Sequence, residues 1–455
     1  MKLTKNEKIP LAITAVTMEG SGLGHYKGMA VFVPNTITGD EITAHIVKVK
    51  SNYAFARLDE LLVASPDRTE PDCPVFLQCG GCAFRHITYE AELKIKENHV
   101  RDTLKRIGRI EVEPELIIGA RCPEHYRNKA QYPVEKNGDA LKIGFYAAHS
   151  HRVIDCRSCL LQPKEFDGIL EVFNNWILQY GIPLYNAANR TGLLRHIYIR
   201  RAEKTGEIMV CAVMNGRDFQ YERELISTLL DKEPNIKSIV INKNKADTNV
   251  ILGEKCKTIW GQDFITDELC GLKFQISPLS FYQVNPEGAK ILYEKAAEYA
   301  ALTGKETVLD LYCGAGSIGL TLAAKAKEII GVEIVPRAVA DAKTNAQING
   351  IKNARFICSD ANEAAQILEQ EGTKPDVVVL DPPRKGCAAD LLQTIAKMEP
   401  GKIVYVSCDP ATLARDCAVL SELGYKVQKV APVDMFPRTG HSEVVVSLRR
   451  DFASR

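Results

Sequence analysis

The amino-acid sequence predicts a multidomain α/β protein with a small N-terminal β-barrel, a central α+β domain and a C-terminal doubly wound parallel sheet. The first observation is length, because 455 residues exceed one ordinary hydrophobic core and suggest about three domains. The second is a run of short strands and glycine-rich turns before residue 63. The third is a regular alternation of helices and apolar strands after residue 285, which is typical of a parallel sheet.

Residues 1–62 are predicted to form the small barrel. The runs LAITAVTM, MAVFVPN and EITAHIVKVK alternate apolar and polar residues at period two, and EGSGLGHYKG and TITGD separate them. The pattern resembles a TRAM domain, an OB-like barrel that binds RNA. An SH3-like structural barrel has the same pattern, so the strand pattern alone leaves both open.

Residues 63–285 are predicted to form the central α+β domain, and residues 286–455 the parallel sheet. The segment PDRTEPDCP is a linker by composition, and strands such as LRHIYIRRAE and SIVINKN follow the charged helix EAELKIKENHVRDTLKRIG. After residue 285, strands such as TVLDLY, EIIGVEIV, DVVVLDPP and KIVYVSCDP alternate with helices. Helices should therefore cover both faces of the sheet, and the ligand site should lie at the C-terminal ends of its strands.

Composition narrows the class of protein. Lys plus Arg number 58 and Asp plus Glu 57, so a nucleic-acid partner would require local basic patches. The apolar runs are shorter than the ~20 residues of a membrane span, and the N-terminal MKLTKNEKIPLAITAV lacks the features of a signal peptide. We therefore expect a cytoplasmic protein without a membrane partner, whose 14 cysteines serve metal binding, catalysis or packing rather than disulfides.

A glycine-rich loop follows the first strand of the predicted parallel sheet. Gly314, Gly316 and Gly319 have G-x-G-x-x-G spacing, and Glu333 ends the next strand, where a carboxylate can accept both hydroxyl groups of a ribose. NAD and S-adenosylmethionine both fit these residues. S-adenosylmethionine is favoured because Asp310 precedes the loop and no basic group for a phosphate lies near it.

Two further strands end in acidic residues. One ends in Ser359-Asp360, which places a polar or acidic contact where an adenine edge would lie. The next ends in Asp381-Pro382-Pro383, a sequence that resembles the D/N-P-P motif of methyltransferases that act on nucleobases.

Cys408 ends the strand after the Asp-Pro-Pro loop. Free cysteine is among the most buried residue types, so a packing role is the simple interpretation, yet this strand end is also where a nucleophile would be displayed. Glu443 opens the apolar strand in TGHSEVVVSL and is a candidate base, while His441 on the same strand face is the competing base.

Five motifs occur in the order FYQVN, LDLYCGAGSIGL, DPPRKG, VSCDP and TGHSEVV between residues 281 and 447, and together they resemble the RNA (uracil-5-)-methyltransferase family. The resemblance implies a Rossmann-like, S-adenosylmethionine-dependent domain. It implies that Cys408 adds to carbon 6 of uracil, which activates carbon 5 for methylation, and that Glu443 then removes the proton from carbon 5. Because a free thiol has a pKa of ~8.5, helix N-terminal amides or a nearby cation should help to form the thiolate.

The resemblance also assigns contacts with the cofactor or the target base. These positions are Gln283, Tyr312, Gly314, Ser317, Glu333, Asp360 and Asp381. Ser317 and Asp360 differ in residue type from those of several family members, which makes their contacts the least secure.

Four cysteines are candidate metal ligands. The spacing Cys73-x5-Cys79-x2-Cys82, with one more thiolate from DCRSCLLQP, fits either a [4Fe-4S] cluster or a tetrahedral zinc ion. The CGGC core is similar to that of the iron–sulfur members of the family, which implies a [4Fe-4S] cluster with Cys159 rather than Cys156 as the fourth ligand. The remaining cysteines are expected to be packing residues: Cys122, Cys211, Cys256, Cys270, Cys313, Cys358, Cys387 and Cys417.

Two stretches, EHYRNKAQY and RTGLLRHIYIRR, interleave basic and aromatic residues. Cations can neutralise phosphates while aromatic rings stack on unpaired bases, which predicts a surface for single-stranded RNA. A solvated strand face is the alternative for each residue. The candidates are Tyr126, Arg127, Lys129, Tyr132, Arg190, Arg195, His196, Arg200 and Arg201.

The barrel and the four cysteines together resemble the branch of the family that acts on 23S ribosomal RNA. That RNA is therefore the expected partner, and no obligate protein partner is expected. The tRNA T-loop branch, which usually lacks both features, is the alternative within the family. An iron–sulfur RNA-binding protein with an inactive transferase domain and a dehydrogenase are the alternatives from other classes.

Overall fold

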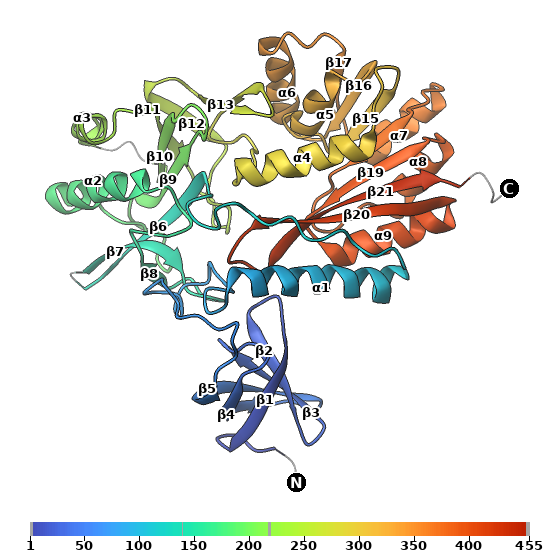
Figure 1. Cartoon of the computed structure of the whole chain (residues 1–455). Coiled ribbons are helices and arrows are strands. Elements are labelled where there is room, and N and C mark those ends of the chain that lie inside the picture. The colour runs from blue at the N-terminus through green and yellow to red at the C-terminus, as the bar shows by residue number, and fades with distance from the viewer. Residues whose placement is uncertain (1–2, 139, 217–219, 452–455) are drawn as a thin grey trace.

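The computed structural model describes residues 3–138, 140–216 and 220–451. The chain forms a barrel, a central sheet with two helices, and a second sheet that carries helices on both faces (Figure 1). Within these described ranges, no helix is both long and apolar enough to cross a membrane.

The N-terminal segment is a closed five-stranded barrel in the order β1-β2-β3-β5-β4, as the period-two pattern predicted. Alternate residues point inward, and Ile9, Leu11 and Ile13 of the first strand join the barrel core. Closure removes the unpaired strand edges that an open small sheet would expose. Its strands are β1 (Lys8–Val16), β2 (Ser21–Tyr26), β3 (Met29–Pro34), β4 (Glu41–Val49) and β5 (Tyr53–Val63).

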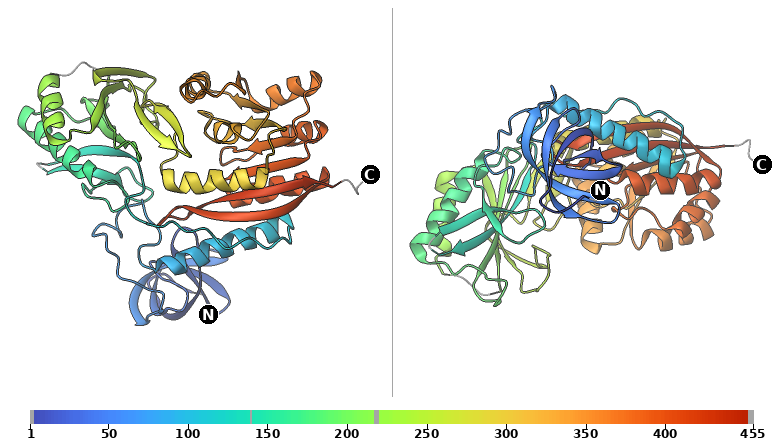
Figure 2. Two further views of the ribbon diagram at one scale, coloured as in Figure 1. Left: turned by 45° about the horizontal axis from the view of Figure 1, so that its top comes forward. Right: turned by 90° about the horizontal axis from the view of Figure 1, so that it is seen from below.

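A long helix, α1 (Tyr89–Gly108), follows the barrel. The Thr88 side chain accepts a hydrogen bond from the amide of Ala91 and so caps the helix. Although α1 lies within the segment 63–285, its residues Val100 and Leu104 pack into the core of the C-terminal sheet. Figure 2 shows α1 lying along that sheet, between it and the barrel.

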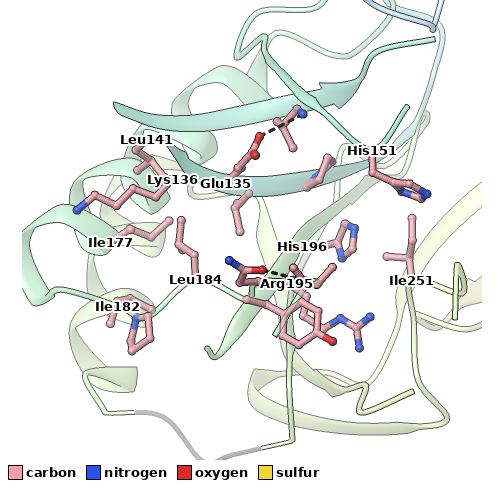
Figure 3. Close-up of a pocket in the computed structure, with 18 of the residues that line it drawn as sticks. Glu135, Lys136, Leu141, His151, Ile177, Ile182, Leu184, Arg195, His196 and Ile251 are labelled. Carbon is pink, nitrogen blue, oxygen red and sulfur yellow. Dashed lines mark hydrogen bonds between the residues drawn. The ribbon is translucent and has the colours of Figure 1, made fainter. Parts of the chain in front are cut away.

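The central domain is a seven-stranded sheet in the order β12-β11-β10-β9-β6-β7-β8. The apolar residues of one of its faces form a core with the helices α2 (Glu165–Tyr180) and α3 (Glu222–Lys232), whereas Tyr198, Cys211 and Val240 belong to a core shared with the C-terminal domain. A pocket opens beside β6 and β9 of this sheet (Figure 3). The strands are β6 (Lys129–Asn137), β7 (Ala140–Tyr146), β8 (Val153–Asp155), β9 (Leu194–Arg201), β10 (Ile208–Met214), β11 (Ile236–Lys243) and β12 (Lys255–Gly261).

The C-terminal domain is a second seven-stranded sheet in the order β17-β16-β15-β18-β19-β21-β20. A hairpin of β13 (Ile265–Leu269) and β14 (Leu272–Ile276) precedes it. Five strands are parallel, whereas β21 runs antiparallel to β19. The strands are β15 (Thr307–Leu311), β16 (Glu328–Glu333), β17 (Ala354–Cys358), β18 (Val377–Leu380), β19 (Lys402–Ser407), β20 (Tyr425–Phe436) and β21 (His441–Arg450).

Helices cover both faces of this sheet, which confirms the doubly wound arrangement predicted from the sequence. Residues of α4, α5 and α6 belong to the core on one face, whereas residues of α1, α7, α8 and α9 belong to the core on the other. The helices are α4 (Pro286–Ala300), α5 (Ser317–Ala323), α6 (Pro336–Ile348), α7 (Ala361–Gln370), α8 (Ala389–Lys397) and α9 (Pro410–Glu422).

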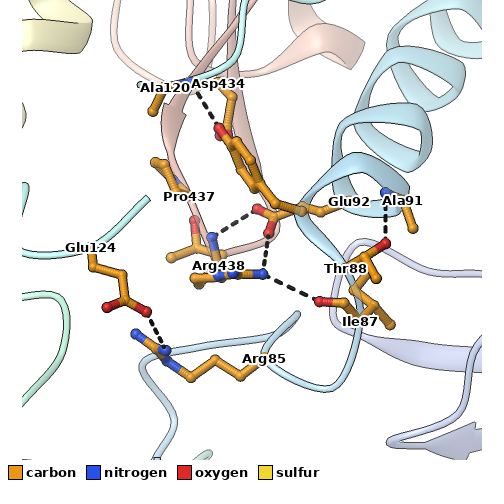
Figure 4. A network of polar contacts seen from close by, with 12 residues as sticks. Arg85, Ile87, Thr88, Ala91, Glu92, Ala120, Glu124, Asp434, Pro437 and Arg438 are labelled. Carbon is orange, nitrogen blue, oxygen red and sulfur yellow. Dashed lines mark hydrogen bonds and ion pairs between the residues drawn. The ribbon is translucent and has the colours of Figure 1, made fainter. Parts of the chain in front are cut away.

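A buried ionic network joins α1 to the turn between β20 and β21 (Figure 4). The fully buried Lys96 ammonium donates to Glu92 Oε1 and to Asp434 Oδ1, each at 2.7 Å, and to the carbonyl of Phe436 at 3.1 Å. Tyr89 donates to Asp434 Oδ2 at 2.6 Å, and the Arg438 amide donates to Glu92 Oε1 at 2.7 Å. These bonds fix the turn that leads into β21.

We expect the Lys96→Met substitution to lower the free energy of unfolding by about 3–5 kcal/mol, because it removes the ammonium bonded to buried Asp434 and leaves buried Glu92 only the more distant guanidinium of Arg438, at 3.7 Å. The matched control is Lys94→Met, since Lys94 lies exposed on the same helix and should change stability by less than about 0.5 kcal/mol. Urea unfolding followed by circular dichroism measures both. Equal midpoints for the two variants would contradict a stabilising role for the network.

Candidate active site

The predicted site residues gather along one edge of the C-terminal sheet. In an open α/β sheet, ligands bind beyond the carboxyl ends of the strands at the point where the strand order reverses. Here the order reverses between β15 and β18. Tyr312, Asp381 and Cys408 directly follow β15, β18 and β19, and Glu333 is the last residue of β16.

The glycine loop after β15 has the conformation that its sequence demands. Tyr312, Gly314 and Gly316 all have positive φ angles, of 66°, 54° and 80°. A Cβ built on Gly314 meets nothing within 4 Å, so the backbone there is open to a ligand. Gly319 has a different role, because a Cβ there would lie 2.6 Å from Asp310 Oδ2. The Gly319 amide donates to that oxygen at 2.9 Å, which ties α5 to β15.

Glu333 presents a fixed carboxylate beside this loop. The amide of Gly314 donates to its Oε2 at 3.1 Å, and the amide of Val335 donates to its Oε1 at 2.9 Å. The side chains of Ile334 and Val335 are exposed directly after it. The carboxylate is therefore held in place next to an apolar surface, as a ribose and adenine site requires.

Tyr293 of α4 connects several predicted residues, although the sequence gave no reason to select it. Its hydroxyl lies 2.9 Å from Ser317 Oγ. Burial raises the pKa of Tyr293, and hydrogen bonds to Ser317 and Gln283 oppose that rise, while the charge of Asp381 adds to it. Ser317, Gln283 and Asp381 thus surround one buried phenol.

Asp360 has a clear structural role. It caps α7, because its Oδ1 accepts hydrogen bonds from the amides of Asn362 at 2.9 Å and Glu363 at 3.4 Å. The carboxylate also lies close enough to Tyr312 to raise the pKa of that phenol. Its predicted contact with a cofactor stays a prediction.

Cys408 and Glu443 face each other across two antiparallel strands. Ser407 pairs with Val444, and continuing that register by one residue sets Cys408 opposite Glu443. Directly opposed residues have Cβ atoms about 4.5–5.5 Å apart. Cys408 is half-buried, whereas Glu443 is only 5% exposed. The competing base, His441, lies at the exposed start of the same strand.

The charges around Cys408 favour the thiol over the thiolate. Burial raises the pKa of Cys408 from 9.0 to about 11, and the nearby carboxylates of Glu443 and Asp381 also raise it. Arg384 lowers it, as the predicted nearby cation, but does not outweigh these effects. Burial likewise raises the pKa of Asp381 to about 7 and the pKa of Glu443 well above its ordinary value.

Arg384 is the positively charged side chain of the site. It lies in the motif DPPRKG, but the sequence gave no reason to select it. It lowers the pKa of both Cys408 and Glu443, and its Nη2 lies 3.4 Å from Nε2 of His441. The carbonyl of Arg384 accepts a hydrogen bond from Thr412 of α9. Arg384 is therefore placed to stabilise negative charge on either Cys408 or Glu443.

The FYQVN segment connects the site to the central domain. Asn128 donates from its side chain to the carbonyl of Gln283 at 3.0 Å and from its amide to the carbonyl of Val284 at 2.8 Å. Asn285 caps α4 and donates to the carbonyl of Met435 at 2.9 Å. The residue before β6 and the end of β20 thus meet at residues 281–285.

The four candidate metal ligands come together from two separate loops. The charges of Cys73 and Cys159 raise the pKa of Cys79, and those of Cys79 and Cys159 raise the pKa of Cys82, so the thiols are electrostatic neighbours. Cys156 also hydrogen-bonds Cys159, which lowers the pKa of Cys159 to about 6. In the part of the chain that the structure describes, however, no three His, Cys, Asp or Glu side chains are arranged to hold a metal ion. The geometry therefore does not support the predicted cluster.

The remaining cysteines divide into two groups. Cys211, Cys313, Cys387 and Cys417 are buried, as expected of packing residues, and Cys270 is half-buried. The packing prediction was wrong for three others, because Cys122, Cys256 and Cys358 are exposed.

A doubly wound sheet with polar residues gathered at the carboxyl ends of its strands, preceded by a small closed barrel, is the arrangement expected of a transferase that acts on RNA. Comparison with known families agrees. Residues 2–58 match the TRAM domain, and residues 218–451 match the family described as tRNA (Uracil-5-)-methyltransferase. The chain therefore belongs to the uracil-5-methyltransferase family of RNA-methylating enzymes.

Similar proteins cover almost the whole chain. An uncharacterized RNA methyltransferase of Halalkalibacterium halodurans is 46% identical and covers 98% of both chains. One from Clostridium tetani is 45% identical over 97% of this chain and 96% of its own. The solved structure of a Pyrococcus abyssi tRNA (uracil-54, C5)-methyltransferase with S-adenosyl-L-homocysteine is 27% identical, with a TM-score of 0.79, over 96% of this chain and 99% of that chain.

We expect the rate of Cys408 alkylation to depend on its two charged neighbours. Glu443→Gln removes a carboxylate that opposes the thiolate, so the pKa of Cys408 should fall by about 1 unit and alkylation at pH 9 should be several-fold faster. Arg384→Gln should raise the pKa of Cys408 and slow its alkylation. Iodoacetamide labelling followed by peptide mass spectrometry measures the rate, with exposed Cys256 of β12 as the internal control. A Cys408 rate that neither variant changes would contradict the electrostatic neighbourhood described above.

Proposed function

We propose that the protein transfers a methyl group from S-adenosylmethionine to carbon 5 of a uridine in RNA through a covalent bond between Cys408 and carbon 6. The observation that carries this proposal is that Cys408 and the buried Glu443 lie one residue beyond the Ser407–Val444 pair at the sheet edge, where the charges of Glu443 and Asp381 both act on Cys408. Membership of the uracil-5-methyltransferase family supports it.

The residues around the glycine loop fit the cofactor. The open space above Gly314, the fixed carboxylate of Glu333 and the phenol of Tyr293 with its neighbour Ser317 provide room, a ribose partner and polar contacts. The related Pyrococcus abyssi structure contains S-adenosyl-L-homocysteine, which supports this assignment. When bound, S-adenosylmethionine supplies the methyl group as a sulfonium electrophile. Tyr312 and Gln283 complete the proposed contacts, and Asp360 acts by orienting α7.

Uracil carbon 5 is a weak nucleophile until a group adds at carbon 6. Cys408 reacts in its thiolate form, which Arg384 favours, and its Sγ forms a bond to carbon 6. The electron pair of the former double bond moves toward carbon 5 and the neighbouring carbonyl, and carbon 5 becomes methylated. Glu443 then accepts the proton of carbon 5, the double bond re-forms, and the bond between Sγ and carbon 6 breaks.

The environment of Glu443 suits a general base. Its raised pKa makes the ionised carboxylate a stronger base than an exposed glutamate, since base strength rises with pKa. Its position opposite Cys408 lets it reach the same face of the uracil ring as the thiol. Asp381, whose pKa is raised to about 7, is positioned to contact the target base.

For the RNA, we propose 23S ribosomal RNA, supported by the resemblance of the barrel and the four-cysteine pattern to that branch. One observation favours tRNA as a second candidate. The Pyrococcus abyssi enzyme, named for uracil 54 of tRNA, matches 96% of this chain, so its alignment necessarily includes most of the barrel. A TRAM domain therefore does not by itself distinguish the two substrates, and the choice rests on the cysteines.

We expect the purified protein to methylate uridine carbon 5 in transcripts of 23S ribosomal RNA. Labelled S-adenosylmethionine is supplied with those transcripts and, separately, with unmodified tRNA transcripts. Cys408→Ala should reduce transfer by at least about 1,000-fold, whereas Glu443→Gln should slow it roughly 100–10,000-fold and accumulate a covalent complex with RNA. Cys256→Ala is the control and should act as wild type.

The following results distinguish the proposed substrate from the proposed mechanism. Transfer to tRNA alone would replace the ribosomal substrate and leave the mechanism intact. Transfer that survives Cys408→Ala would remove the thiol as nucleophile. With 5-fluorouridine RNA, a methylated adduct should stall on Cys408, because Glu443 cannot remove fluorine as a proton.

We also propose that Cys73, Cys79, Cys82 and Cys159 hold a [4Fe-4S] cluster, with zinc as the alternative. The donor set supports this, because all four side chains are thiols, and the Gly81 amide donates to Cys79 Sγ at 3.4 Å. Amide hydrogen bonds to sulfur are typical of cluster ligands. The proposal requires the sulfurs to move closer together than they lie here.

Anaerobically purified protein should contain about four iron atoms and four acid-labile sulfides per chain if all four cysteines bind the cluster. Cys159→Ser should lower the iron content markedly, whereas Cys156→Ser should keep it, since Cys156 is expected to be a neighbour rather than a ligand. Elemental analysis and visible absorption measure both. One zinc per chain without iron would select the alternative, and no metal of either kind would remove the site.

A further inference from the structure

The central domain contains a pocket that the proposed reaction does not use. It has a volume of ≈ 1080 Å³ and lies between β6, β7, the end of α2 and the segments 181–188 and 247–251 (Figure 3). Ligand pockets of proteins generally have volumes of about 300–1,000 Å³. The pocket is therefore large enough for a nucleotide with room to spare.

A β-bulge places a cation in this pocket. In the pairing of β9 with β10, Val213 lies opposite His196 but Met214 lies opposite Leu194, so Arg195 is an extra residue without a partner position. A bulge redirects a side chain, and bulges are common beside functional sites. Arg195 and His196 would point to opposite faces of a regular strand, yet both line the pocket.

The guanidinium of Arg195 is held but not fully paired. Its Nη1 donates to the carbonyls of Asn244 at 2.9 Å and Ala246 at 3.0 Å, and its plane lies 4.4 Å from the ring centre of Tyr185. Its Nε is buried and has no partner among the residues described. The arginine is thus fixed on an aromatic ring with hydrogen-bonding capacity remaining.

His196 is a second buried polar group with free capacity. It is 8% exposed, its Nε2 lies 3.3 Å from the hydroxyl of Tyr146, and its Nδ1 has no partner in the described part of the chain. Burial and Arg195 lower its pKa to about 4, so the ring is neutral at pH 7 and offers one donor and one acceptor. The sequence predicts Arg195 and His196 either as RNA contacts or as parts of a solvated strand face. Both side chains are buried, which contradicts the solvated strand face.

The aromatic rings at the pocket, and the strands that lead from it toward the FYQVN segment, are suited to binding RNA. Tyr146 and His151 are in edge-to-face contact at 5.6 Å, and both also line a smaller pocket that reaches Gly80 and Gly81 of the cysteine loop. Pro133 pairs with His196 at the pocket, and Lys129 pairs with Arg200 four residues along the same two strands. Arg200 donates to the carbonyls of Ser277 and Ser280, just before the FYQVN segment.

A four-residue length of strand spans roughly 13 Å. The pocket therefore lies about 13 Å along β6 and β9 from the Lys129–Arg200 pair, and a single-stranded RNA footprint of about 4–16 nucleotides is long enough to cover both places.

We propose that this pocket binds an unpaired nucleotide of the substrate RNA outside the target uridine, with its base on Tyr185 and Tyr146 and its polar edge on Arg195 and His196. The inference rests on the proposed function, because it takes RNA to be the substrate. Stacking on aromatic rings and cation–π contact hold bases without a fixed sequence, and the free nitrogen atoms of Arg195 and His196 add hydrogen bonds to a base edge or phosphate. The pocket thereby contributes to the choice of RNA.

The test uses the full-length protein and two probes, transcripts of 23S ribosomal RNA and of tRNA that contain 4-thiouridine. Irradiation should crosslink at least one transcript to peptides that contain Tyr146, Tyr185 or His196. Tyr185→Ala should weaken binding of that transcript about 10-fold, as expected for loss of one stacked base. Tyr185→Phe, which keeps the ring, should bind nearly as tightly as wild type.

The matched control is Tyr180→Ala. Tyr180 belongs to the same domain but stacks on Tyr221 at 4.4 Å and does not line the pocket. It should leave RNA affinity unchanged, and every variant should bind S-adenosylmethionine within about twofold of wild type, which excludes global misfolding.

Absence of these crosslinks with both transcripts, or wild-type RNA affinity in Tyr185→Ala, would overturn the inference. Protection of the same peptides by AMP or UMP, with RNA affinity unchanged by Tyr185→Ala, would assign the pocket to free nucleotides and overturn it as well. If Tyr185→Ala weakens RNA binding while the wild-type protein methylates neither transcript, the pocket stands and the proposed function fails.

Discussion

The placement of the proposed base depends on a buried cation. Lys96 has no exposed surface and is bonded to Glu92, Asp434 and a carbonyl of the turn between β20 and β21. A buried charge is costly unless it is paired, so this turn and α1 stabilise each other only in one arrangement. Glu443 lies seven residues after Phe436, near the start of β21, the strand that follows the turn. The barrel also contacts this turn, since a Cβ on Gly440 would lie 1.8 Å from the carbonyl of Met18. The position of the base is thus set by parts of the chain that are remote in sequence.

The same constraint explains the electrostatics of the site. With the β19–β21 register fixed, Cys408, Glu443 and Asp381 are forced into one small volume that is partly shielded from water. Burial raises the pKa values of all three groups, and repulsion from neighbouring carboxylates adds to the rise for Cys408 and Glu443. Arg384 supplies the one opposing influence that acts on both Cys408 and Glu443. A positively charged ligand in this crevice would favour the ionised forms, which couples the reactivity of the thiol to occupancy of the cofactor site.

The sequence predicted the C-terminal sheet and its ligand edge well, because apolar periodicity and glycine spacing are local signals. It could not predict contacts between distant segments. Tyr293 is an ordinary apolar position of α4 until the fold sets it against Ser317, and α1 appeared to belong to the central segment although it packs on the C-terminal sheet. The basic and aromatic stretches suggested open surfaces, yet Arg195 and Arg200 are buried and bonded to carbonyls. Burial of a long polar side chain depends on the tertiary structure, which local composition does not contain.

The two sheets work as one surface because shared segments, rather than a flexible linker, join them. Asn128 bonds the backbone at Gln283 and Val284, and Asn285 bonds the end of β20. The proposed nucleotide pocket of the central domain is consequently joined to the C-terminal domain through residues 281–285. RNA held in that pocket would present its target uridine at a defined position, and flipping the uridine costs a few kcal/mol that remote contacts can offset. Selection of one uridine among many then depends on whether the shape of the RNA lets it reach the central domain and Cys408 at the same time. Base identity at the proposed nucleophile, Cys408, cannot provide that selection, because every uridine presents the same ring.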